Sequence, residues 1–327
     1  MRLSPYAYAL LLAAASLLAP AVACCAVPAT TIEGPEKDDK GILTYTVTSE
    51  YQKGANPVQI LLPKKLEEGA KYPVLYILPV NPGPTGKYGS GILEAWKLDV
   101  ANQYGLICVY PSFDSYPWYA DHPWDSQVRQ ESYLLKVVLP LVEAKTPALA
   151  EPRGRLLIGF SKSGWGAFSL LLRHPELFGR AAAWDAPLMQ PTPDRYNMAD
   201  VFPSPAAFEQ YRIPALLEKR ADLLRPGPPR LTLLGYWNFK VPTQQAHEKM
   251  VELGIPHHFD NSKKLPHDWH SGWFAEAVKY LVMPDPGAAP PPPAKSSEPA
   301  KTPKPALGFS HSFPDLPSPI ALPGRAW

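Results

Sequence analysis

The chain has 327 residues, of which 46% are hydrophobic, enough for one large domain or two ordinary ones with a sizeable core. Its 32 basic and 30 acidic side chains nearly balance, so no overall field favours a nucleic acid or an anionic membrane as partner. Three cysteines in so long a chain exclude a disulfide framework and a cysteine-based metal site.

Residues 1–23 have the pattern of a secretory signal peptide, because Arg2 precedes an apolar run that closes on the small residues "AVA". We expect cleavage before Cys24 and a secreted or periplasmic protein. Cys24 resembles the acceptor of a bacterial lipoprotein, although such signals usually carry Leu at the position of Ala21, so a lipid anchor is the minor alternative. An uncleaved membrane anchor is less favoured still, since Pro20 interrupts the run.

The two ends of the mature chain lack a pattern of buried faces. Residues 24–40 are polar and predict a flexible lead-in, and residues 284–327 hold 13 of the 42 prolines. Such a segment buries too little apolar surface to offset the entropy of ordering it. We therefore expect a folded domain at 41–283, followed by a disordered tail.

Within the domain, strand-like and helix-like segments alternate. Segments 42–51 and 57–63 predict an antiparallel pair at a sheet edge, joined by a turn at 54–57. The apolar runs 72–80 and 105–111 are typical of strands covered on both faces, which would bury Cys108. Further strands are expected at 155–160, 180–184, 229–237 and 256–260, and helices at 126–144, 164–174, 242–254 and 271–282. This alternation predicts an α/β domain whose mostly parallel central sheet has helices on both faces.

Residues 186–229 form an irregular interlude between expected strands, with two short helices. An insertion of this length either covers an active site or is a plain connection.

The segment "GFSKSG", residues 159–164, raises the question of a catalytic serine. A serine hydroxyl becomes a nucleophile when a base takes its proton and the oxygen is held clear of neighbouring side chains. A tight turn between a strand and a helix holds it clear, provided that the flanking residues are small. Ser163 stands where the simple motif has Gly, but its side chain is small. The motif alone is weak evidence; its position between an expected strand and helix makes Ser161 the candidate nucleophile.

A catalytic base is expected late in the chain. His267 lies in a loop after the last predicted strand and before the last helix, where hydrolases of this architecture place their histidine. His270 begins the final helix and is better suited to capping or to solvent. His257 and His258 lie on opposite faces of a strand, and for both we favour a structural role.

Three stretches carry a family resemblance: "GFSKSGWGAFSLLLRHPELFGRAAAW", "SYPWYADHP" and "GIPHHFDNSKKLPHDWHSGW". Together they resemble the esterase family of the α/β-hydrolase superfamily that holds esterase D, feruloyl esterases and mycobacterial mycolyltransferases. The resemblance spans roughly residues 45–282. It implies an α/β-hydrolase fold, with Ser161 as nucleophile and His267 as base.

The acid of the triad departs from the family pattern, because the matching position after the seventh strand is Asn238. An amide does not offset the charge of an imidazolium. Either Asn238 orients His267 by a hydrogen bond, or a carboxylate replaces it, or the site is inactive. Asp185, at the carboxyl end of a neighbouring strand, is favoured over Asp268, whose side chain is expected to point away from the adjacent His267.

The oxyanion hole needs one backbone N–H after the nucleophile and one from the loop after the third strand. Lys162 supplies the first. In the second loop, where the family usually has His-Gly, the chain reads "LPVNPGPTGKYGSG". Pro79 and Pro82 have no N–H, which leaves Val80 or Asn81 as the donor.

Trp118, Tyr119, Trp165 and Trp237 fall on or near loops around this site and are candidates for aromatic walls of a substrate pocket, with core packing as the alternative. The histidines and Asp268 match no standard metal spacing, so we expect neither a metal nor a cofactor.

The sequence therefore predicts an exported serine esterase for a small-molecule or carbohydrate-linked ester, working through an acyl-enzyme, with acyl transfer as a close variant. The alternative is a catalytically impaired binding protein for a carbohydrate or a cell-surface partner, with Asn238 as the mark of lost chemistry.

Overall fold

The computed structural model describes residues 30–83, 86–235 and 237–284. The predicted signal peptide, Cys24 and the proline-rich tail beyond Pro284 lie outside the described residues. Within the described part, no helix is both long and apolar enough to cross a membrane.

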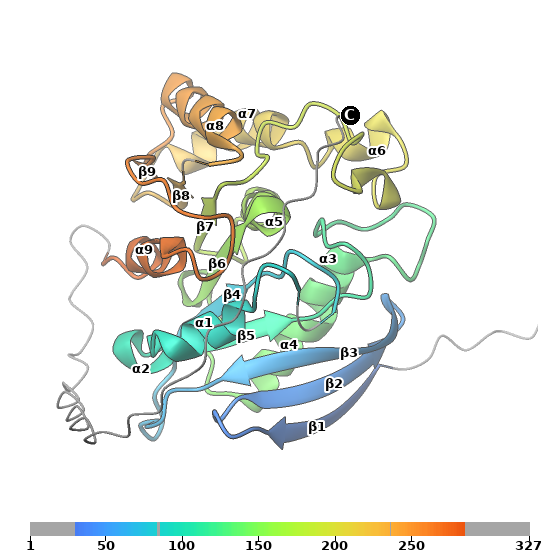
Figure 1. Cartoon of the computed structure of the whole chain (residues 1–327), viewed down its shortest axis with the longest axis vertical. Helices are drawn as coiled ribbons and strands as arrows, with labels where there is room; N and C mark the ends of the chain where they lie inside the picture. The colour runs from blue at the N-terminus through green and yellow to red at the C-terminus, as the bar shows by residue number, and fades with distance from the viewer. Residues whose placement is uncertain (1–29, 84–85, 236, 285–327) are drawn as a thin grey trace, which may run out of the picture. The chain divides into compact units, whose positions relative to one another are not determined.

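A nine-stranded sheet runs through the domain in the order β1-β2-β3-β5-β4-β6-β7-β8-β9 (Figure 1). Its strands are β1 (Thr31–Lys37), β2 (Leu43–Ser49), β3 (Gln52–Leu61), β4 (Val74–Ile77), β5 (Ile107–Pro111), β6 (Arg155–Phe160), β7 (Arg180–Trp184), β8 (Leu231–Leu234) and β9 (His257–Asp260). Six neighbouring strands of this order are parallel, namely β5, β4, β6, β7, β8 and β9. Strands β1, β2 and β3 extend the sheet beyond β5 in antiparallel pairing.

Helices cover both faces of this sheet. They are α1 (Gly91–Lys97), α2 (Val100–Tyr104), α3 (Gln130–Tyr133), α4 (Leu139–Lys145), α5 (Ser161–Arg173), α6 (Pro205–Glu209), α7 (Ile213–Leu224), α8 (Lys240–Glu252) and α9 (Trp273–Leu281). Alternate residues of each central strand face opposite sides, so Leu75 and Ile77 join a core with α1, α2 and α9, whereas Val74 and Tyr76 join a core with α3 to α8. Two hydrophobic cores therefore hold the sheet between helical layers. The predicted fold class is confirmed.

The register of β6 and β7 places two candidate residues at one edge of the sheet. Phe160 pairs with Trp184, so the next residues of the two strands, Ser161 and Asp185, leave the sheet side by side. Since parallel strands end at a common edge, this end of the sheet is where the site is assembled.

The helix predicted over 126–144 consists of α3, a π-helical turn at Leu134–Val138, and α4. Pro140 lies just after the π-helical turn, and the helical backbone angles of Val138 and Leu139 show that the helix continues through the proline. The interlude holds α6 and α7 as predicted, and the Ser204 hydroxyl caps α6 by accepting from the backbone N–H of Ala207.

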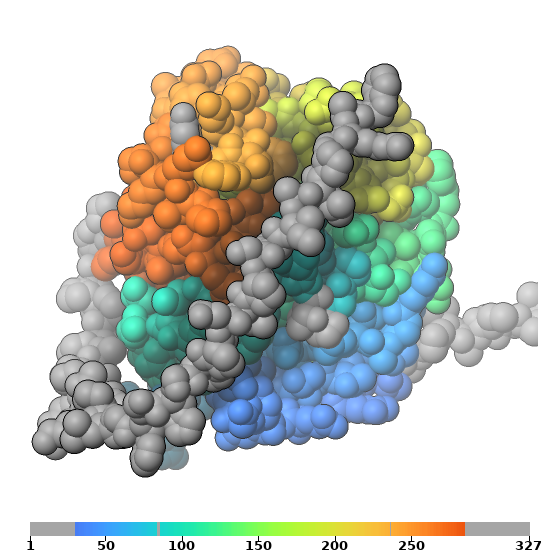
Figure 2. Space-filling model, in the orientation of Figure 1, coloured from blue at the N-terminus to red at the C-terminus, as the bar shows by residue number. Residues whose placement is uncertain are grey.

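Two expectations near the N-terminus are wrong. Residues 31–37, expected in the flexible lead-in over 24–40, form the edge strand β1. All seven residues are exposed, on the surface that Figure 2 shows in blue. Their sequence therefore lacks the alternation of apolar and polar residues that indicates a strand, and backbone pairing with β2 holds them in place. The hairpin turn lies at residues 50–51 instead of 54–57, and residues 54–57 belong to β3. Pro57 is tolerated within this strand because it pairs only with β2, so its missing N–H breaks no pairing with β5.

Candidate active site

Ser161 begins α5 directly after β6, with a φ of +52°. This left-handed conformation is unfavourable for a residue with a side chain, and it persists only where the surrounding structure enforces it. The residue is 8% exposed. The tight turn predicted from the sequence is therefore present, and it holds the serine in a strained conformation.

Small neighbours are required for this turn. A Cβ at Gly159 would lie 2.4 Å from the carbonyl oxygen of Ser163, and one at Gly164 would lie 2.9 Å from the Cβ of Ala186. The hydroxyl of Ser163 accepts from the N–H of Phe160 at 3.1 Å and donates to its carbonyl oxygen at 2.9 Å. Serine therefore fits where the simple motif has glycine, and it ties the turn together.

Asp185 follows β7, also with a left-handed backbone, at φ +43°, and its side chain is 1% exposed. Its carboxylate accepts backbone N–H groups from Asn238 at 3.2 Å and from Phe239 at 2.6 Å. These two amides stand at the start of the 13-residue helix α8, whose N-terminus favours negative charge. The local structure therefore supports a buried carboxylate at this position.

His267 lies in the loop before α9, with its Nδ1 at 2.5 Å from Oδ2 of Asp185. Its ring has edge-on contacts with Phe160, at 5.1 Å between centroids, and with Tyr88, at 5.5 Å, and a tilted contact with Phe239 at 5.8 Å. A carboxylate at Nδ1 selects the tautomer with a proton on that nitrogen, which leaves Nε2 as a base.

The structure separates the three groups proposed to orient this histidine. Asp185 contacts the ring, whereas Asn238 supports Asp185 through its backbone N–H. Asp268 accepts from the backbone N–H of His270 at 2.8 Å. The side chain of His270 is 40% exposed, so it faces solvent as expected, and its ring also pairs with Glu94.

One cavity of about 420 Å³ joins these parts, since both Ser161 and His267 line it, together with Val80, Asn81 and Lys162. The N–H of Lys162 is in the first turn of α5, where it has no acceptor within the helix. In the part of the chain that the structure describes, the N–H groups of Val80 and Asn81 have no hydrogen-bond acceptor. All three residues chosen as oxyanion donors therefore lie at the cavity with N–H groups that are not consumed elsewhere.

The predicted aromatic walls are wrong for the fully buried Trp118, Tyr119 and Trp165, which belong to the core beneath the cavity. Trp165 packs edge-on against Trp118, with 5.3 Å between ring centroids. The hydroxyl of Tyr119 donates to the carbonyl of Pro79 at 2.6 Å and so holds the loop that carries Val80. These rings support the site from the core and do not line the cavity.

Trp237 is also outside the cavity lining, although it is 42% exposed. The ammonium of Lys264 lies 4.6 Å from the centroid of its ring.

The aromatic lining comes instead from four residues that sequence reasoning did not select: Tyr88, Tyr116, Tyr196 and Phe239. Tyr196 and Asn197, which also lines the cavity, belong to the interlude at 186–229, so this insertion does reach the site. Both have left-handed backbone conformations, which no sequence pattern predicted. Lys87 also lines the cavity and was not among the site residues predicted from the sequence.

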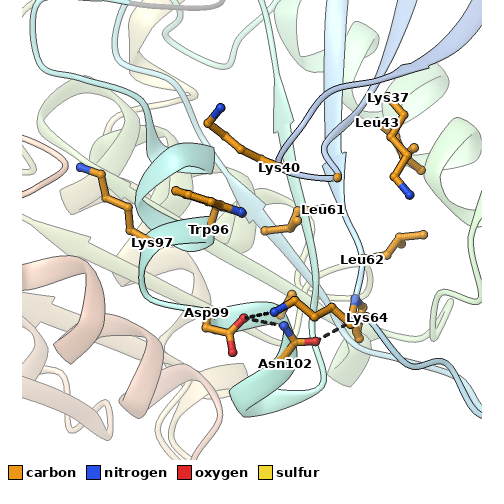
Figure 3. A pocket seen from close by; sticks show the side chains of 13 residues that line it. Lys37, Lys40, Leu43, Leu61, Leu62, Lys64, Trp96, Lys97, Asp99 and Asn102 are labelled. Atoms are coloured by element: carbon orange, nitrogen blue, oxygen red, sulfur yellow. Dashed lines mark hydrogen bonds and ion pairs between the residues drawn. The ribbon is translucent and has the colours of Figure 1, made fainter. Parts of the chain in front are cut away.

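A larger cavity, of about 570 Å³, lies elsewhere, between α1, α2 and the strand edge (Figure 3). Four lysines line it: Lys37, Lys40, Lys64 and Lys97. Three of them have a carboxylate partner, with Nζ to oxygen distances of 2.7 Å for Lys40, 4.0 Å for Lys64 and 3.9 Å for Lys97. None of the predicted catalytic residues lies there.

The comparison with protein families agrees with this geometry. The model of the family described as "Putative esterase" matches residues 49–250, well over half of the chain. The chain belongs to this esterase family. The resemblance drawn from the sequence is thereby confirmed. No curated protein has a sequence that matches the chain.

Solved structures of several hydrolases share the fold. A ferulic acid esterase is 21% identical, with a TM-score of 0.58, over 74% of this chain and 96% of its own. An S-formylglutathione hydrolase from Agrobacterium tumefaciens is 16% identical, with a TM-score of 0.60, over 77% of this chain and 98% of its own. A fluorophosphonate-binding serine hydrolase from Staphylococcus aureus is 16% identical, with a TM-score of 0.61, over 74% of this chain and 98% of its own. At these identities the likeness shows the α/β-hydrolase fold.

Proposed function

We propose that this member of the esterase family is a serine esterase that hydrolyses a carboxylic ester through an acyl-enzyme. The observation that carries the proposal is the pairing of Asp185 with His267, in the same cavity as a serine on a strained turn. Membership of an esterase family and the serine hydrolases among the structural neighbours support it.

In the first half of the reaction, Nε2 of His267 takes the proton of the Ser161 hydroxyl while the oxygen attacks the ester carbonyl. The carbonyl oxygen becomes negatively charged and accepts the N–H of Lys162 and one N–H from the loop at Val80 and Asn81. The imidazolium then gives its proton to the departing alcohol, which leaves an acyl group on the serine.

In the second half, water replaces the alcohol, and His267 acts again as base and then as acid. Asp185 keeps the ring in one orientation and stabilises its charge in both halves. Transfer of the acyl group to an alcohol uses the same steps with another acceptor. The buried carboxylate, held by two backbone amides, supplies the charge that an amide at Asn238 lacks.

The alternative of a binding protein without activity rested on the amide at Asn238. Because a carboxylate stands beside His267, the departure at Asn238 no longer favours that alternative.

Labelling with a fluorophosphonate probe and hydrolysis of short p-nitrophenyl esters test the proposal. We expect the purified protein to be labelled on Ser161 and to cleave the esters, and Ser161→Ala to lose both. Ser169→Ala is the matched control, since Ser169 is a buried serine of the same helix that does not line the cavity. A wild-type protein that is folded but shows neither labelling nor hydrolysis would support the binding protein instead.

A further inference from the structure

The wall of the cavity at Ser161 carries positive charge and no acidic side chain among the described residues. Lys162 and Lys87 both line it, and among the described residues none that lines it is Asp or Glu. Asp185 lies behind His267, and its carboxylate is already occupied by the imidazole and two backbone amides. A ligand in this cavity therefore meets two ammonium groups.

Lys162 is held against an aromatic surface. Its Nζ lies 3.8 Å from the ring centroid of Tyr116 and 6.0 Å from that of Trp118. Within residues 30–83, 86–235 and 237–284, no carboxylate oxygen lies within 4.0 Å of this ammonium. Contact with a ring orients a cation but leaves its N–H donors free for an acceptor.

Lys87 also lies against an aromatic ring, on another wall of the cavity, but unlike Lys162 it is exposed. Its Nζ lies 4.8 Å from the ring centroid of Tyr88, the residue whose ring also contacts His267. In the described part of the chain it too has no carboxylate within 4.0 Å. Two lysines from separate segments therefore line the cavity, and neither ammonium has a carboxylate oxygen within 4.0 Å among the described residues.

Holding an ammonium in this way is unfavourable unless something binds it. The pKa of Lys162 is lowered to about 8, mainly because burial disfavours the charged form; the charge of Asp200 raises the pKa, and the charge of Lys87 lowers it. An anion in the cavity would restore the electrostatic stabilisation that water no longer supplies.

We propose that Lys162, assisted by Lys87, binds a negatively charged group of the substrate, so that this site prefers esters bearing a carboxylate or similar anion close to the scissile carbonyl. The group must be close because Lys162 directly follows the nucleophile. This inference rests on the proposed function for its catalytic test, and a binding test makes it independent.

Matched ester pairs test the preference. Monomethyl succinate carries its charge on the acyl side, and dimethyl succinate is the neutral partner. Para-acetoxybenzoate and its methyl ester place the same difference on the alcohol side. We expect kcat/KM for the charged member of at least one pair to exceed that of the neutral member by about tenfold to a hundredfold, the range of one hydrogen bond to a charged group.

Variants at Lys162 assign this ratio to the ammonium. Lys162→Met keeps a long apolar side chain against Tyr116 and is expected to reduce the ratio to within about threefold of unity, whereas Lys162→Arg retains most of it. Lys136→Met is the matched control, because Lys136 also stacks over a tyrosine, Tyr51 at 5.5 Å, but lies outside the cavity. Its ratio should equal that of the wild type.

A binding measurement separates failure of the inference from failure of the proposed function. Titration of the Ser161→Ala variant with monomethyl succinate, followed by NMR, should show saturable shifts that dimethyl succinate does not reproduce and that Lys162→Met abolishes. Hydrolysis with equal rates for both members of each pair overturns the inference and leaves the esterase intact. Lys162-dependent binding in a protein that hydrolyses no ester supports the inference about the anion and overturns the proposed esterase function. Absence of both overturns the inference as well.

Discussion

The two lysine-lined cavities differ in what surrounds their ammonium groups. In the peripheral cavity of Figure 3, the side chains of Lys64 and Lys97 are 84% and 54% exposed and each has an acidic neighbour. In the cavity at Ser161, Lys162 lies against rings, and no carboxylate oxygen of the described residues is within 4.0 Å of its ammonium. The peripheral cavity is the larger, at about 570 Å³ against 420 Å³.

Volume therefore does not single out the cavity that holds the proposed catalytic residues. Solvated and paired charges contribute little to folding or to binding, because water and salt already satisfy them. A charge that is desolvated without a partner opposes folding, and such arrangements concentrate at functional sites.

The largest contrast is expected between Asp185, which lies behind His267, and Asp99, which lines the peripheral cavity. Asp185→Asn should lower kcat by roughly 10⁴-fold, the loss known for the same change in a serine-protease triad, because an amide favours the wrong tautomer of His267. Asp99→Asn in the peripheral cavity should leave kcat unchanged, and its left-handed backbone, at φ +50°, suits Asn well. Ester hydrolysis under saturating substrate measures both. Equal activity of Asp185→Asn and wild type would remove Asp185 from the mechanism.

The next contrast is in pH dependence. The Lys162 ammonium is charged below its pKa of about 8 and neutral above it, so the preference for an anionic ester should fall as pH rises through 8. At pH 9 the charged fraction is about a tenth, and the ratio of kcat/KM for the charged and neutral esters should drop by up to about tenfold. Other titratable groups also line the cavity, namely Lys87, Tyr88, Tyr116, Tyr196 and His267, and the carboxylate of Asp200 is near Lys162.

The titration of His267 affects kcat/KM of both esters alike, so it cancels in their ratio. The same ratio in Lys162→Met gives the pH dependence without the ammonium. A ratio that stays constant from pH 7 to pH 9.5 would contradict the assignment.

A smaller contrast concerns stability. Lysine has a pKa of about 10.5 in the unfolded chain, so the unfolded state binds this proton more tightly than the folded state, where the pKa is about 8. The charged side chain therefore opposes folding below pH 8, and this penalty disappears as pH rises from about 8 to about 10.5. Lys162→Met should raise the free energy of unfolding at pH 7 by roughly 1 to 3 kcal/mol, with the gain shrinking at higher pH.

Urea denaturation of wild type and variant measures this gain. Lys97→Met, in the peripheral cavity, is the control and should stay within about 0.5 kcal/mol of the wild type. A loss of stability in Lys162→Met would show that the contact with Tyr116 outweighs the desolvation of the charge.

The smallest effect is expected from the peripheral lysines themselves. Lys64→Gln and Lys97→Gln should change the preference for charged esters by less than about twofold, since their exposed ammonium groups are screened by salt. The same ester pairs measure it. A larger change would mean that the peripheral cavity acts on the substrate.

Much of this site could be predicted because it depends on local chemistry. Small residues around Ser161 indicate a tight turn wherever an apolar strand leads into a helix, and Asp185 follows such a strand directly. The aromatic walls could not be predicted in the same way. Trp118 and Tyr196 look alike as large residues in loops, but one is buried and the other lines the cavity.

The amino-acid sequence by itself determined the alternation of strands and helices, the strained turn at Ser161 and the chain order of nucleophile and histidine, because these follow from periodicity and from backbone sterics over a few residues. Only the tertiary structure decided that Asp185 rather than Asn238 contacts His267, and that Lys162 is desolvated. Contact and burial depend on which distant segments meet at the end of the sheet, and no short stretch of sequence contains that information.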